Sequence, residues 1–167
     1  LVDQFCSFLT EAALTDGIRF YVLYTKAHKA ALQSFLSETL SFTASHINFK
    51  PYAKSKQRIC PTLNQITKPT HLRSLFLAQS TGKCTVLVDD VLPSVGNLST
   101  LQNLIDGEHI SIKSDFAPLQ HYNNRLCIVC VTDKSSTIEY LHKKELKAHM
   151  LDFSLTESAA SHPIELN

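Results

Sequence analysis

The chain has 167 residues, 44% of them hydrophobic, and carries 16 basic and 15 acidic residues for a net charge of +1. This length and composition suit one well-buried domain and are short for two. Because the charges are balanced and spread along the chain, the overall charge excludes a strong general attraction to nucleic acids or membranes. Nucleic-acid binding would need a local basic patch.

The cysteines are odd in number and unevenly spaced, which argues against a disulfide framework and indicates a reducing compartment, the nucleus or the cytoplasm. No apolar run approaches the length of a membrane span, and no basic segment precedes an apolar signal sequence. We therefore expect no membrane partner. The cysteines are Cys6, Cys60, Cys84, Cys127 and Cys130.

Apolar residues recur with the spacing of a helix face in several segments, and apolar, β-branched runs typical of buried strands lie between them. The expected helices are 2–14, 27–40, 70–79, 97–106 and 135–149. The expected strands are 18–24, 83–91, 126–132 and 150–154. Because helices and strands alternate, we expect one α/β domain at 1–154, a three-layer core with helices flanking a mostly parallel sheet, and a tail at 155–167.

Two regions are less regular. Residues 108–133 carry two alternating or apolar runs around a polar centre before the last buried strand. Residues 41–70 are expected to form a surface excursion, with short strands at 46–50 and 57–60. Within it, residues 50–58 are basic without any acid, so they could contact a phosphate backbone, and a solvated loop is the alternative. Its candidate contacts are Lys54, Lys56 and Arg58.

The pair Gly82-Lys83 stands just ahead of an apolar strand that ends in two aspartates, the outline of a nucleotide-hydrolysis site. A phosphate-binding Walker A loop needs Gly-x-x-x-x-Gly-Lys-Ser/Thr after a strand and before a helix. Here the first glycine position is Leu77, the hydroxyl position is Cys84, and the pair leads into a strand. We therefore interpret Gly82 as part of a turn.

The chain offers no Walker A motif elsewhere, because no two of its glycines, Gly17, Gly82, Gly96 and Gly107, are five residues apart. Topology would place the motif at 23–32, after the first interior strand. There Thr25 and His28 stand where glycines are needed for close backbone approach to phosphate, and Ala30 replaces the hydroxyl after Lys29. Lys29 could still contact an anion, and a solvated helix lysine is the alternative.

The run "VLVDD" at 86–90 has the form of a Walker B strand, which carries a carboxylate to the carboxyl edge of a sheet to hold Mg²⁺. A capping or turn role for Asp89 or Asp90 is an equal alternative. The sequence after it includes "LIDGEHISI" at 104–112 and the strand "CIVCVT". This succession resembles the superfamily 3 replicative helicases of small DNA viruses, such as the papillomavirus replication helicase and polyomavirus large T antigen.

The resemblance spans roughly residues 5–154 and implies an AAA+ core, in which the acidic strand is followed by a helix, a hairpin that enters the central channel, and a strand ending in a sensor asparagine. Several positions depart from the family pattern. The sensor position is Asp133, and residues 143–144 supply lysines where a trans-acting arginine is expected. The hairpin tip, where the helicases carry a Lys-His pair that grips DNA, reads Ser-Asp at 114–115, so the nearby Lys113 is the candidate DNA contact there.

We therefore expect a pseudo-ATPase without a cofactor, a helicase-like module that binds proteins in DNA replication or genome maintenance. Its vestigial nucleotide site would comprise Lys29, Asp89, Asp90 and Asp133. Self-association through the AAA+ surface and contact with DNA stay open. One alternative is an active or nucleotide-binding helicase in which the first three of these residues hold Mg-ATP. Another is an adaptor that resembles the MCM-binding protein.

The motif "CIVC" at 127–130 could suggest a metal or redox site. Residues three apart on a strand point to opposite faces, however, so the two thiols cannot converge. We expect both to be buried and structural. The histidines show no spacing that is typical of zinc ligands, so no metal site is predicted.

Overall fold

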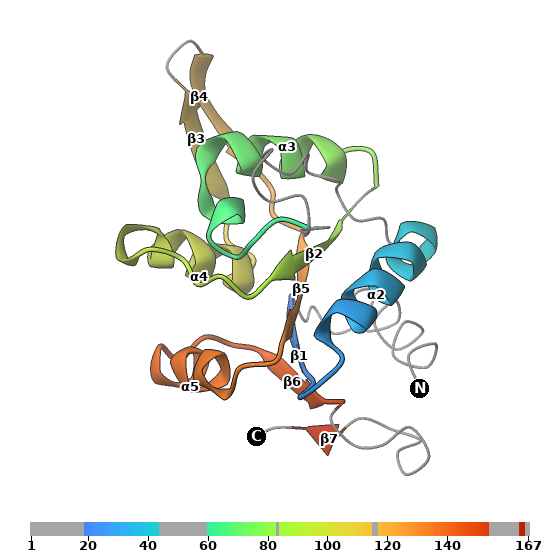
Figure 1. Ribbon diagram of the computed structural model, residues 1–167. Coiled ribbons are helices and arrows are strands. Elements are labelled where there is room, and N and C mark those ends of the chain that lie inside the picture. The colour runs from blue at the N-terminus through green and yellow to red at the C-terminus, as the bar shows by residue number, and fades with distance from the viewer. Residues whose placement is uncertain (1–18, 44–59, 83, 115–116, 154–163, 166–167) are drawn as a thin grey trace, which may run out of the picture.

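The computed structural model describes residues 19–43, 60–82, 84–114, 117–153 and 164–165. It is an α/β fold in which one sheet, with four parallel strands, is flanked by helices (Figure 1). The strands run across the sheet in the order β2 (Thr85–Asp89), β5 (Cys127–Thr132), β1 (Phe20–Tyr24), β6 (His149–Asp152) and β7 (Ile164–Glu165). The last of these pairs antiparallel to β6. The α/β class and the mostly parallel sheet expected from the sequence are confirmed.

The central strands are apolar because both of their faces are covered. Every residue of β5 is buried, and so are the first four of β1. The two strands pair in parallel register, with Phe20 beside Ile128 and Tyr24 beside Thr132. Continuous apolar runs of this kind are what a parallel sheet between helix layers requires.

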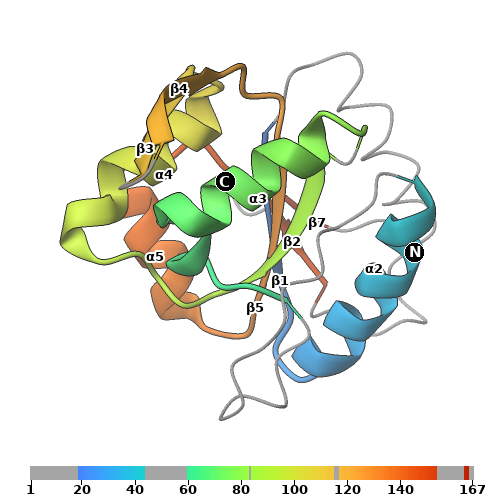
Figure 2. The same ribbon diagram turned by 90° about the horizontal axis from the view of Figure 1, so that it is seen from above.

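The helices divide between the two faces of the sheet (Figure 2). On one face, α2 (Lys29–Thr43) packs Leu32 and Leu36 against the sheet. The other face is covered by α3 (Pro69–Gln79), α4 (Leu98–Asp106) and α5 (Ser135–Lys143). The buried side chains of the three helices on that second face include Leu72, Phe76, Leu101, Leu104 and Leu141.

Helix α5 ends at Lys143, earlier than the expected 149. Glu145 adopts a left-handed backbone with φ of 56°, its N–H donates to the carbonyl of His142, and the N–H of Leu146 donates to the carbonyl of Leu141. This is a Schellman-type ending, and it turns Leu146 into the core. Leu146 extended the helical pattern in the sequence, but it is the turn after the helix that buries it.

A β-hairpin separates α4 from β5 and forms a second, two-stranded sheet of β3 (Ile110–Ser114) and β4 (Ala117–Tyr122). Gly107 ends α4 with φ of 73°, as the sequence predicts, and the side chain of Arg19 lies against it. At the base of the hairpin the Tyr122 ring stacks on Phe76, with ring centroids 5.0 Å apart. The hairpin is thus anchored on the core at its base and projects away from the main sheet (Figure 1).

The edge of the sheet beside β2 is extended by the segment that precedes the short helix η1 (Gln65–Thr67). Thr62 forms a parallel bridge with Asp89, and the N–H of Leu63 donates to the carbonyl of Asp89. A second short helix, η2 (Val95–Asn97), leads into α4.

Several expectations fall outside the described residues. These are the helix at 2–14, the short strand at 46–50, and most of the short strand at 57–60 and of the tail, in which residues 164–165 form β7. Within the described ranges, no helix combines the length and apolar character needed to cross a membrane.

Candidate functional site

Polar side chains gather where β1, β2 and β5 end. Because these parallel strands are neighbours, their carboxyl ends meet at the same edge of the sheet. Lys29 begins α2 after β1, Asp89 ends β2 and Asp90 follows it, and Thr132 is the last residue of β5. We call these four residues the edge cluster.

The edge cluster is held by short polar contacts. The Lys29 Nζ lies 2.8 Å from Asp89 Oδ1 and 2.8 Å from Asp90 Oδ1, so one ammonium bridges both carboxylates. The Thr132 hydroxyl donates to Asp90 Oδ2 at 2.6 Å. Gln33 Nε2 donates to Asp89 Oδ1 at 3.2 Å, and the backbone N–H of Asp90 donates to the same oxygen at 2.9 Å. Both carboxylates are thus hydrogen-bonded within the protein.

Burial and charge act against each other in the edge cluster. The side chains of Lys29, Asp89 and Asp90 are 20%, 16% and 2% exposed. Burial lowers the pKa of Lys29, but hydrogen bonds and attraction to both carboxylates outweigh it and raise the pKa above its usual value. Burial likewise raises the pKa of Asp89, but the hydrogen bonds from Lys29, from the Asp90 N–H and from Gln33, together with the attraction to Lys29, outweigh it and lower the pKa. The Lys29–Asp89 pair is therefore ionised at neutral pH.

The connection from β1 to α2 consists of residues 25–28. It is shorter than the roughly six residues that a Walker A motif places ahead of its lysine. The N–H of Thr25 donates to the carbonyl of Thr132 at 3.0 Å, and the N–H of Phe153 donates to the carbonyl of Tyr24 at 2.7 Å. The pairing of β1 with its neighbours therefore continues up to the connection, and the N–H of Thr25 belongs to the sheet.

The structure brings together three of the four residues expected in the nucleotide site. Lys29, Asp89 and Asp90 contact one another, so Lys29 is not a solvated helix lysine. The fourth, Asp133, is exposed and is not among the partners of Lys29. Its neighbour Thr132 is fully buried and contacts Asp90 instead.

Sequence reasoning missed Thr132 and Gln33. Each had a local signal: Thr132 is a polar residue that closes an otherwise apolar strand, and Gln33 lies four residues after Lys29, on the same face of α2. Those signals become specific only when the neighbouring strand is known to carry the two aspartates.

Of the expected nucleic-acid contacts, Lys113 is the one that falls within the described residues. Lys113 is exposed on β3, and the basic candidates Lys54, Lys56 and Arg58 lie outside the described residues. Gly82 lies in a turn after α3 with φ of 91°, and its N–H donates to the carbonyl of Gln79. The turn expected there is confirmed, and Lys83 lies outside the described residues.

Cys127 and Cys130 lie on opposite faces of β5, as their spacing predicts. Cys127 belongs to the core on the α2 side and Cys130 to the core on the other side. Burial raises the pKa of Cys127 to about 12 and that of Cys130 well above its usual value. Both thiols are therefore protonated and structural at neutral pH. Among the described residues, no group of three His, Cys, Asp or Glu side chains is placed to hold a metal ion.

The oxygens of Asp89, Asp90 and Thr132 are of the type that Mg²⁺ prefers. The Lys29 ammonium contacts both carboxylates, so a cation at that position would compete with an internal positive charge. The charged groups of the edge cluster are thus paired with one another, and they lie at the edge of the sheet where α/β proteins bind ligands.

No protein-family model matches this chain, and no curated protein matches it either.

Proposed function

We propose that this chain is a catalytically inactive, helicase-like (pseudo-AAA+) domain that serves as a protein-interaction module in DNA replication or genome maintenance. The observation that carries the proposal is the ion pair of Lys29 with Asp89 and Asp90. It lies at the edge of the sheet where a helicase of this type would hold Mg²⁺ and the nucleotide phosphates.

The order of elements supports the helicase-like part of the proposal. After the acidic strand β2 come a helix, a hairpin and the strand β5, the succession that the resemblance to superfamily 3 helicases implies. In AAA+ proteins the sensor strand lies between the strands of the Walker A and Walker B motifs, and β5 likewise lies between β1 and β2. The parallel bridge of Thr62 to Asp89 adds a further segment beside β2.

The local chemistry supports the inactive part. Residues 25–28 contain no glycine, and Ala30 offers no hydroxyl to a metal ion. To admit Mg²⁺ and a phosphate, the Lys29 ammonium would have to leave its two carboxylates. Each charge-assisted hydrogen bond of this kind contributes about 1.5–3 kcal/mol. Contacts inside the protein thus oppose the binding of Mg²⁺ and phosphate, whereas a functional nucleotide site favours this binding.

The protein-interaction part is supported by exposed apolar side chains. Val95 is 94% exposed on η2, just after the acidic strand, and Leu119 is 52% exposed on the projecting hairpin. Both side chains present apolar surface that a protein partner could cover.

The proposal is tested by titrating the protein with Mg-ATP while following the backbone amide signals of Lys29, Asp90 and Thr132 by NMR. We expect no saturable change of these signals at millimolar nucleotide and no increase in melting temperature. Saturable shifts at these residues that disappear in Lys29→Ala, but persist in the exposed neighbour variant Lys26→Ala, would overturn the inactive assignment. The interaction role is tested by co-purification with a replicative helicase subunit. If the two proteins do not co-purify, the adaptor that resembles the MCM-binding protein is ruled out.

A second candidate, a nucleotide-binding helicase with a remodelled site, is favoured by one observation. Lys29, Asp90 and the Thr132 hydroxyl form a connected lysine, carboxylate and hydroxyl set, as an ATP site would need. It predicts ATP hydrolysis that Asp90→Asn abolishes, whereas the inactive domain shows none in either form.

A further inference from the structure

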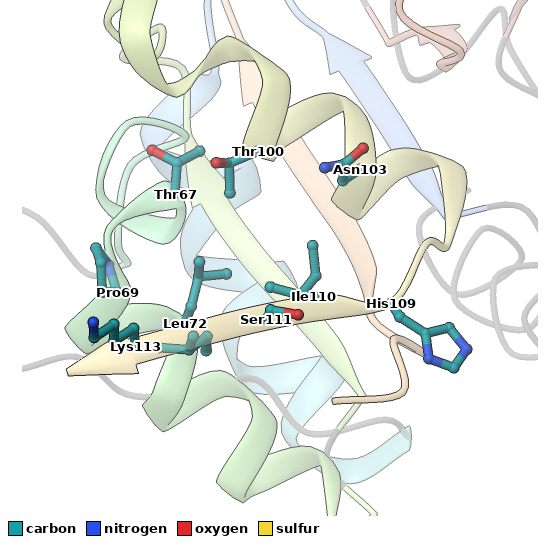
Figure 3. Close-up of a pocket in the computed structure, with 10 residues that line it drawn as sticks. Thr67, Pro69, Leu72, Thr100, Asn103, His109, Ile110, Ser111 and Lys113 are labelled. Carbon is teal, nitrogen blue, oxygen red and sulfur yellow. The ribbon is translucent and has the colours of Figure 1, made fainter. Parts of the chain in front are cut away.

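A cavity of about 370 Å³ lies between η1, α3, α4 and the hairpin strand β3 (Figure 3), and none of its described lining residues belongs to the edge cluster. Its size falls within the range of about 300–1,000 Å³ that is usual for small-molecule sites. Its lining combines an apolar wall with polar groups. The wall residues are Pro69, Leu72, Ile110 and Ile112, and the polar residues are Thr67, Thr100, Asn103, His109, Ser111 and Lys113.

The charge of this lining favours an anion. Its described residues include the cation Lys113 and no carboxylate. Figure 3 shows Lys113 at the same end of the cavity as Pro69, the first residue of α3, with His109 at the other end of β3. The side chain of the N-cap residue Lys68 makes no capping hydrogen bond, and the start of a helix favours negative charge.

The polar side chains of the lining are available to a ligand. Within the described residues, no hydrogen bond or ion pair involves the side chain of Thr100, Asn103 or Lys113. Thr67 and Ser111 differ, because the hydroxyl of Thr67 donates to the carbonyl of Asn64 and that of Ser111 contacts His121.

The hairpin is irregular at this cavity. The register between β3 and β4 shifts between Ile112 and Ser114, so that Pro118 and Leu119 together oppose Lys113. Such bulges re-aim a side chain and are frequent beside functional sites. The irregularity therefore falls at Lys113, the cation among the described lining residues.

We propose that this cavity binds a small organic phosphate, with the phosphate against Lys113 and the body of the ligand against the apolar wall. A lysine ammonium is a common point-charge partner of phosphate. Thr100 and Asn103 supply hydrogen bonds to the ligand. This site is independent of the proposed function, because it shares no residue with the edge cluster.

The proposal is tested on the full chain with phenyl phosphate, which has an anionic end and an apolar body, and with phenol as the uncharged control. We expect saturable NMR shifts of the amide signals of Thr100, Asn103, Ser111 and Lys113 with phenyl phosphate and weaker or no shifts with phenol. Lys113→Ala and Lys113→Gln should each raise the dissociation constant about tenfold or more. Lys147→Ala, which removes an exposed lysine before β6, should leave it unchanged.

Other results would overturn the proposal. Equal shifts with phenol and phenyl phosphate would show that the cavity does not select an anion. If neither Lys113 variant weakened binding, the phosphate would not lie against Lys113. Absent or non-saturable shifts would remove the site. Shifts at Lys29, Asp90 and Thr132 instead would put the anion in the edge cluster, and so would overturn this inference and challenge the inactive assignment together.

Discussion

In the edge cluster, the charged side chains of Lys29, Asp89 and Asp90 satisfy one another, whereas at the cavity beside β3 the side chains of Lys113 and Thr100 have no partner among the described residues. The sequence pattern points to the first region as the ligand site. The structure shows there a lysine held by the protein itself, and polar groups available to a ligand in the second. Residues whose types match a ligand-binding motif are therefore not always available to a ligand, because the protein can pair them internally.

This difference has energetic consequences. Buried charges that pair internally are costly to separate, because the group left behind loses its partner without regaining water. Exposed, unpaired groups can be removed at little cost to stability. The effects of substitutions on stability should therefore be larger in the edge cluster than at the cavity, and this difference tests whether the two regions are as unlike as their contacts indicate.

The largest effect is expected for Asp90→Ala. This change removes the most buried carboxylate of the edge cluster, takes away the closer of the two acceptors of the Thr132 hydroxyl and removes one of the two carboxylates that bind Lys29. We expect a loss of about 3 kcal/mol in the free energy of unfolding, measured by urea denaturation. Asp133→Ala, which removes the exposed neighbouring carboxylate, is the matched control and should change stability by less than about 0.5 kcal/mol. Equal effects would contradict the geometry.

Lys29→Ala should cost about 2 kcal/mol at neutral pH, because Asp89 and Asp90 would then face each other without a cation. The pH dependence should also change. In the wild type the pKa of Asp89 is lower in the folded than in the unfolded protein. The Asp89 carboxylate therefore contributes its stability above its unfolded pKa near 3.8, and this stability is lost as the pH falls through the folded pKa. The Asp89 contribution to stability should therefore stay level from pH 7 to about 5 and fall only below about 4.

The variant should behave in the opposite way. Without Lys29, Asp89 lies beside a second carboxylate with no cation between them, so its pKa rises and acidification from pH 7 to about 5 should increase the stability of the variant relative to the wild type. Denaturation at several pH values measures this directly. A Lys29→Ala profile parallel to that of the wild type would show that Lys29 does not control these carboxylates.

Gly107→Ala should cost about 1 kcal/mol, because Gly107 has a φ of 73° that alanine rarely adopts and because a Cβ would displace the Arg19 side chain. This turn leads from α4 to the hairpin that lines the cavity. Gly96→Ala serves as the control, since a Cβ there meets open space and should be neutral or slightly stabilising. Thermal denaturation compares the pair, and a neutral Gly107→Ala would argue against the left-handed helix end.

The smallest effect on stability is expected for Lys113→Ala. Lys113 is exposed and has no hydrogen-bond or ion-pair partner among the described residues, so its removal should change the free energy of unfolding by less than about 0.5 kcal/mol. Urea denaturation beside Lys29→Ala provides the comparison of the two lysines. A loss as large as that of Lys29→Ala would mean that Lys113 is a structural residue.

The parts of the fold that follow local rules were predictable from the sequence. The apolar runs of β1, β2 and β5 identify buried strands, because a parallel sheet between two helix layers needs apolar side chains on both faces. The end of α4 at Gly107 follows from the freedom of glycine to adopt positive φ. The opposite orientation of Cys127 and Cys130 follows from the alternation of side chains along a strand.

Contacts between distant segments were decided only by the tertiary structure. Lys29 and Asp90 are 61 residues apart, and their contact depends on β5 lying between β1 and β2. The contact of Thr132 instead of Asp133 with Asp90 depends on a one-residue difference in position at the end of β5, where successive side chains point in opposite directions. The cavity exists because α3, α4 and β3 pack around a space that none of them specifies alone. Local propensity thus determined the elements, and packing determined which polar groups meet and which stay free.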